Sequence, residues 1–66
     1  MNWEVIESGG DDFHAWETEA CSNGTIRLTV KVYGEGSEKP GAVVVEYWDS
    51  FDSYYNNEKP VRVTRK

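Results

Sequence analysis

Residues 14–33 read HAWETEACSNGTIRLTVKVY, and the alternation within this stretch decides the fold. From Ile26 to Val32 every second residue is apolar, and the residues between them are polar or charged. A period of two is typical of a β-strand with one face toward a core. The first part of the stretch alternates in the same way, with Glu17 and Glu19 on the polar side. The stretch therefore predicts two neighbouring strands joined by a turn.

The length of that turn decides which residues share a face. A two-residue turn at Asn23 and Gly24 would place Glu17 and Glu19 on the apolar face, where carboxylates are very costly. A three-residue loop that starts at Ser22, with Gly24 left-handed in a bulge, restores the alternation. The predicted register therefore pairs Cys21 with Thr25, Glu19 with Arg27, and Trp16 with Val30 on the inner side.

The remaining segments extend the same sheet. We predict further strands over residues 2–7, 42–48 and 61–64, a turn over 8–12 and a long loop over 34–41. The strand over 42–48 is apolar on both faces apart from Glu46, which is typical of a strand inside a sheet. The last strand follows Pro60, so it is predicted at an edge, with Val61 and Val63 facing inward.

Residues 49–58, DSFDSYYNNE, allow two interpretations. Asp49 or Ser50 could cap a short helix that ends at the two asparagines and covers the strand over 42–48. Its apolar stripe would consist of Phe51, Tyr54 and Tyr55. The low helix propensity of these residues makes a wide loop the alternative. The sequence thus predicts one mainly β domain over residues 1–66. We expect about five antiparallel strands in one curved or partly closed sheet, with at most one short helix near 50–57.

No motif for catalysis occurs in the chain. A nucleophile elbow, a phosphate-binding glycine loop and a paired-histidine zinc motif are all missing from the sequence. Asp11, Asp12 and His14 could share a metal ion, but a structural site needs a closed set of four ligands. We therefore expect a non-enzymatic protein with no catalytic residue, no metal and no cofactor.

Composition indicates the compartment. The single cysteine, Cys21, cannot form a disulfide within the chain. The longest apolar run covers residues 42–45, which is too short for a signal peptide or a membrane-spanning helix. We therefore expect a cytoplasmic protein that does not bind a membrane.

Charge is distributed unevenly along the chain. The net charge is −5, and the first basic residue, Arg27, follows six acidic ones. Residues 58–66 carry one acid and four bases. An acidic body repels phosphate backbones, because nucleic-acid affinity comes mostly from lysine and arginine. The sequence therefore predicts no direct binding of nucleic acid, and the basic end is interpreted as a solvated terminus.

The carboxylates themselves suggest recognition of a partner. Glu17 and Glu19 lie on one side of a strand, ~6.8 Å apart over two residues, which is about two nucleotide steps along DNA. Aromatic residues interleaved with acids around residues 46–55 resemble the centre of an interface. The candidate partner-binding residues are Glu4, Glu7, Asp11, Asp12, Glu17, Glu19, Glu46, Asp49, Asp52 and Tyr54. That these residues share one face is a hypothesis, and an ordinary solubilising surface is the alternative.

In size, acidity and lack of catalytic motifs, the chain resembles small acidic phage-encoded inhibitors of the anti-CRISPR and anti-restriction type, which mimic DNA. The resemblance rests on composition and shares no motif, so it assigns no residue. It implies a stoichiometric inhibitor in the host cytoplasm that blocks the basic groove of a nucleic-acid-binding enzyme or complex. We expect such a protein to act as a monomer and to bind a basic partner.

Two other functions fit the same sequence. The exposed edge strand over 61–65 could pair with a neighbour in a structural or assembly subunit. A small ligand-binding β-barrel using Trp3, Trp16 or Trp48 is the third hypothesis.

Overall fold

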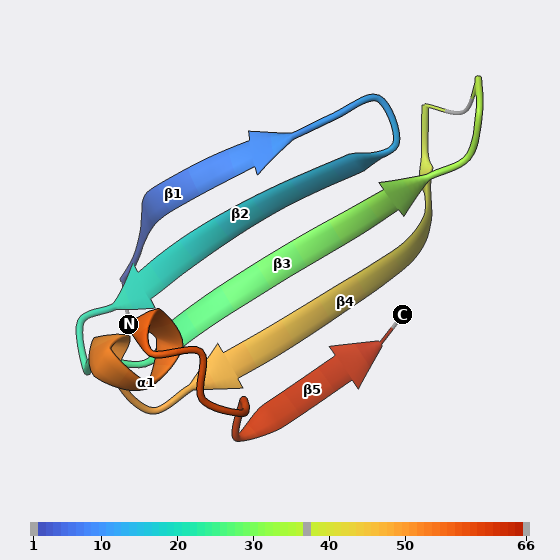
Figure 1. Ribbon diagram of the computed structural model, residues 1–66. Helices are drawn as coiled ribbons and strands as arrows, with labels where there is room; N and C mark the ends of the chain where they lie inside the picture. The colour runs from blue at the N-terminus through green and yellow to red at the C-terminus, as the bar shows by residue number, and fades with distance from the viewer. Residues whose placement is uncertain (1, 37, 66) are drawn as a thin grey trace.

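The computed structural model describes residues 2–36 and 38–65, which form one open antiparallel sheet with a short helix (Figure 1). The elements are β1 Trp3–Gly10, β2 His14–Cys21, β3 Ile26–Tyr33, β4 Pro40–Trp48, α1 Phe51–Tyr55 and β5 Arg62–Arg65. The strands lie side by side in sequence order, so β1 and β5 form the two edges. The predicted mainly β architecture is confirmed. Because the two edges do not meet, the sheet is not closed, which excludes the partly closed form of the two predicted alternatives.

The turn between β2 and β3 has the predicted form. The Cys21 amide donates a hydrogen bond of 2.8 Å to the Thr25 carbonyl, and Gly24 has a φ of 96°. Glu19 pairs with Arg27 and Trp16 pairs with Val30, as the alternation requires. The three-residue loop is therefore confirmed.

The hairpin between β1 and β2 differs from the prediction. β1 continues to Gly10 instead of turning after residue 7. Gly9 lies under the ring of Trp16, and a Cβ atom there would stand 2.7 Å from the ring carbon Cζ2. Glycine in this strand lets the Trp16 ring approach the backbone closely. In the sequence, the same glycines are typical of a turn, which is why the sequence predicts a turn. A bulge between Val5 and Glu7 shifts the register of β1 against β2.

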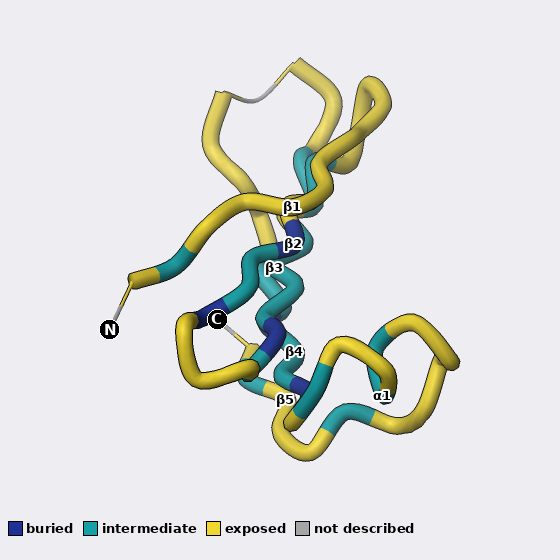
Figure 2. The backbone as a smooth tube through the Cα atoms, turned by 90° about the vertical axis from the view of Figure 1, so that its left-hand side faces the viewer, coloured by how far each residue is buried: buried dark blue, intermediate teal, exposed yellow. Residues whose placement is uncertain are grey.

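The two faces of the sheet are covered differently. Figure 2 shows α1 on one side of the sheet, which we call the helix side; the other is the open side. Thr18, Ile26 and Trp48 point to the helix side and are buried there. The helix-side part of the core therefore lies beneath α1, at one end of the sheet, while Cys21 and Val45 are buried on the open side.

The helix prediction is confirmed, but its aromatic stripe is divided. Ser50 is the N-cap and accepts a hydrogen bond from the Ser53 amide at 3.2 Å. Tyr54 packs on Trp48 with ring centroids 5.2 Å apart. Phe51 and Tyr55 instead stack on each other at 5.8 Å and remain exposed. A helix of five residues is too short to press all three rings onto the sheet.

The edge position of β5 is confirmed, whereas the inward position of its valines is wrong. Val61 and Val63 are 61% and 46% exposed. The reason is that α1 lies toward β2 and β3 and does not extend over β5 at the edge, so this part of the helix side is bare (Figure 1). Within the described residues, no helix is long and apolar enough to cross a membrane.

Candidate partner-binding groove

Strand alternation sorts the charged residues between the two faces. The bulge in β1 places both Glu4 and Glu7 on the helix side, where Glu46 also points. The helix side of the strands thus carries three carboxylates and one guanidinium, that of Arg65. The open side of the strands carries Glu17, Glu19, Arg27, Lys31 and Arg62. The single acidic surface expected from the sequence is therefore not formed, because Glu17 and Glu19 lie among three bases on the opposite face.

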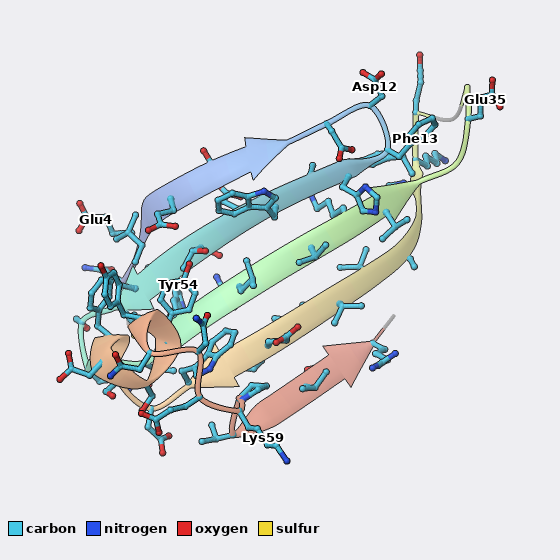
Figure 3. The ribbon with its side chains drawn as sticks, viewed as in Figure 1. Glu4, Asp12, Phe13, Glu35, Tyr54 and Lys59 are labelled. Carbon is cyan, nitrogen blue, oxygen red and sulfur yellow. The ribbon has the colours of Figure 1, made fainter. Side chains whose placement is uncertain are left out.

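Four other predicted residues lie outside the strands of both faces, namely Asp11, Asp12, Asp49 and Asp52. Figure 3 shows Glu4 and Asp12 at opposite ends of β1, with Asp12 at the tip of the hairpin. Asp11 precedes it in the same turn. Asp49 and Asp52 are exposed at the start of α1. The fold therefore brings Glu7, Glu46 and Tyr54 together, keeps Glu4 on the same face at the start of β1, and disperses the rest of the predicted set.

Asp11 has a structural role. Its carboxylate accepts hydrogen bonds from the Phe13 amide at 2.9 Å and the His14 amide at 2.8 Å. His14 Nδ1 lies 3.1 Å from the same oxygen. These contacts, the Phe13 amide first, lower the pKa of Asp11 below its ordinary value of 3.8.

Among residues 2–36 and 38–65, no three side chains of metal-binding type converge.

A groove of about 430 Å³ opens between α1 and the helix side of the sheet. It is lined by Glu7, Leu28, Glu46, Trp48, Tyr54, Tyr55 and Asn57. Two carboxylates and three aromatic rings thus line one hollow, and no lysine or arginine is among these lining residues. We call this hollow the acidic groove. Trp48, Tyr55 and Asn57 were not among the predicted site residues, although their proximity in sequence to Glu46 and Tyr54 was a usable signal.

Tyr54 fixes one wall of the acidic groove. Figure 3 shows its side chain pointing from α1 toward the sheet. Its hydroxyl donates to Glu7 Oε2 at 3.3 Å and lies 3.2 Å from Thr18 Oγ1. Since the tyrosine proton goes to Glu7, the buried Thr18 hydroxyl donates to Tyr54. One phenol therefore links α1, β1 and β2 and holds Glu7 at the groove.

Glu46 forms another wall and differs from an ordinary surface acid. It is half-buried between Leu28 of β3 and Val63 of β5, two apolar neighbours on the same face. Its carboxylate makes no hydrogen bond or ion pair with the rest of the described chain. Glu46 therefore lies half-exposed at the groove without an ion-pair partner among the described residues.

The open side neutralises its own charges. Arg27 forms an ion pair with Glu19 at 2.9 Å, and its guanidinium lies 4.0 Å from the centre of the Trp3 ring. Arg62 lies 5.6 Å from the centre of the Tyr47 ring. A smaller hollow of about 220 Å³ on this part of the sheet includes both Glu17 and Lys31 in its lining. Carboxylates on the open side therefore have bases close by, unlike those of the acidic groove.

The tryptophans do not share an interior. Trp3 lies on the open side, whereas Trp16 and Trp48 lie on the helix side of the open sheet. The geometry of a ligand-binding barrel is therefore not present.

Comparison of the chain with protein-family models, with curated proteins and with solved structures found no match.

Proposed function

We propose that the protein is a non-enzymatic binding module that docks its helix side on the basic surface of a nucleic-acid-binding protein. The acidic groove receives a lysine or arginine side chain of that partner. The observation that carries the proposal is the pairing of two carboxylates with aromatic walls in a groove whose lining holds no base. By occupying the partner's basic surface, the module would act as a stoichiometric inhibitor.

The groove suits a cationic side chain for two physical reasons. Carboxylates attract an ammonium or guanidinium group, and hydrogen bonds between charged groups are roughly twice as strong as neutral ones. Aromatic faces add cation–π attraction, and Tyr55 is exposed enough to provide one. Glu46 gains most from such a ligand, because it has no counter-charge among the described residues.

The surrounding charge favours a partner that normally binds nucleic acid. Glu4 lies on the same face as the groove, and Asp52 belongs to the helix beside it. Proteins that bind nucleic acid present clusters of lysine and arginine to phosphates. An acidic surface accelerates association with such clusters through long-range attraction, an effect that salt weakens.

The proposal is tested with three forms of the protein as immobilised bait. The first is the unmodified chain, the second is Glu7→Gln/Glu46→Gln, and the third is Glu17→Gln/Glu35→Gln. The third form removes the same number of carboxylates from positions outside the acidic groove. Each bait is incubated with a lysate of the cells in which the protein acts, at low and at high salt. Captured proteins are then assayed for nucleic-acid binding with the soluble module as competitor.

The expected result is a nucleic-acid-binding protein retained by the first and third baits at low salt and lost from the second. The soluble module should also displace labelled nucleic acid from it. Equal retention by all three baits would remove the acidic groove from the interface. A captured partner that binds module and nucleic acid simultaneously would refute inhibition by occupancy.

A further inference from the structure

The sheet has two edges of opposite character. β1 and β5 each have a hydrogen-bonded neighbour on one side only, so each presents unpaired backbone groups along its outer side. Such edges are templates for pairing with another chain unless they are blocked. The side chains beside these backbone groups therefore decide which strand can pair with each edge.

The charges on the two edges are complementary. β1 carries the acids Glu4 and Glu7, and β5 carries the bases Arg62 and Arg65. Glu7 and Arg65 both point to the helix side. Pairing β1 with β1, or β5 with β5, would bring like charges together across the junction, which is destabilising. Pairing β5 of one copy with β1 of another would bring Arg65 to the face that carries Glu4 and Glu7, while Arg62 lies on the open side of the same junction.

Apolar exposure is also concentrated at these edges. Val5 and Ile6 are exposed on β1, and Val61 and Val63 are exposed at β5. Burial of such side chains contributes roughly 25 cal/mol per Å² of apolar area removed from water. The edges thus offer exposed apolar side chains as well as charge.

We infer that the chain associates with further copies of itself head to tail, with β5 of one copy beside β1 of the next. In an antiparallel sheet of five consecutive strands the first and last run in the same direction, so this junction is parallel. It keeps the helix side of every copy on the same side of the extended sheet. The bulge in β1 and the four-residue length of β5 restrict the junction. The association is therefore weak and reversible, and it does not rest on the proposed function.

Charge reversal provides a direct test. Glu4→Lys/Glu7→Lys makes both edges basic, and Arg62→Glu/Arg65→Glu makes both edges acidic. Glu17→Lys/Glu35→Lys changes the net charge as much as the first variant but leaves both edges intact. Circular dichroism verifies the fold of each variant. Glu4→Lys alone serves as a second form, because it leaves the contact between Glu7 and Tyr54 in place.

Sedimentation velocity is measured from about 10 µM to about 1 mM, where mass action reveals weak association. At low salt, the average mass of the unmodified chain and of the Glu17→Lys/Glu35→Lys control should rise by about twofold or more at the highest concentration. Each edge variant alone should remain monomeric, and an equimolar mixture of the two should regain the association. A monomeric unmodified chain over the whole range would overturn the inference. So would association of either edge variant alone to the same extent.

Discussion

The helix side and the open side of the sheet are stabilised in different ways. On the helix side, Thr18, Ile26 and Trp48 are buried beneath α1 and the segment that follows it. On the open side, Val45 and Cys21 are buried although α1 lies on the opposite side of the sheet. Neighbouring side chains on the same face, among them the ion-paired Glu19 and Arg27, shield these two residues from solvent instead.

The difference teaches where charge serves the fold and where it is available to a partner. The open-side carboxylates, Glu17 and Glu19, share their face with three bases, and Glu19 forms an ion pair with Arg27. Those of the acidic groove face aromatic and apolar side chains, and Glu46 has no counter-charge there. Substitutions on the two faces should therefore differ in both size and kind of effect.

Trp48→Ala should have the largest effect on stability. The ring packs on Tyr54, and its indole N–H donates to the Glu58 carbonyl at 2.8 Å, which anchors the chain after α1. Removing a buried tryptophan typically costs about 3–5 kcal/mol. Small domains often have little more than about 5 kcal/mol in total. Urea denaturation followed by circular dichroism should show a largely unfolded variant at 25 °C.

The matched substitution on the open side is Tyr47→Ala. Tyr47 is the preceding residue of β4, is only half-buried and contacts Arg62 through its ring. We expect a clearly smaller loss than for Trp48→Ala. If both variants lost the same free energy of unfolding, the core would not be concentrated beneath α1.

Tyr54→Phe should have the next largest effect. The substitution removes the hydroxyl that Thr18 contacts, and Thr18 is 0% exposed. A buried polar group that loses its partner costs about 1–3 kcal/mol. Adding Thr18→Val removes the stranded hydroxyl, so the double variant should be more stable than the sum of the single losses predicts. A double-mutant cycle from urea denaturation measures this coupling. Additive losses would contradict a direct contact between the two hydroxyls.

Most of the fold follows from local rules in the sequence. The cost of a carboxylate on an apolar face was enough to select the three-residue loop before β3, and the structure has that loop. Ser50 and Asn56, the observed caps of α1, were visible as capping residues. The bulge at Val5 and Glu7 was not predictable, because it depends on how β1 fits β2 and not on alternation within β1.

The candidate site was less predictable than the fold for the same reason. A shift of one residue sends a side chain to the other face, so the bulge decides that Glu7 joins Glu4 and Glu46. Charge counting along the chain could not separate Glu17 and Glu19 from them. The sequence did indicate that acids and aromatic residues mix around Glu46 and Tyr54, which is where the acidic groove lies.

Glu19→Gln and Glu46→Gln compare the two faces with the same chemical change. Glu19→Gln removes the charge that pairs with Arg27 and should cost about 0.5 kcal/mol, since such pairs are worth roughly 0.2–1 kcal/mol. Glu46→Gln should cost nothing or slightly stabilise, because no counter-charge in the described chain compensates this carboxylate. Denaturation at low and high salt measures both, and salt should reduce only the loss at Glu19. A loss at Glu46 equal to that at Glu19 would indicate that its charge serves the fold.

Asp11 gives the smallest effect, which should appear only in acid. Its lowered pKa means that folding favours the carboxylate form, so its contribution to stability is complete above the ordinary value of 3.8. This contribution is lost as the pH falls through the lower pKa of the folded state. Asp11→Asn keeps an oxygen for the Phe13 and His14 amides but cannot titrate. Thermal unfolding of both forms between pH 2 and pH 6 should therefore show a difference in stability above about pH 4 that shrinks toward pH 2. A constant difference would mean that the amide hydrogen bonds, and not the charge, are what the hairpin tip gains from this residue. The hairpin tip would then differ from the open side, where the charge of Glu19 pairs with Arg27.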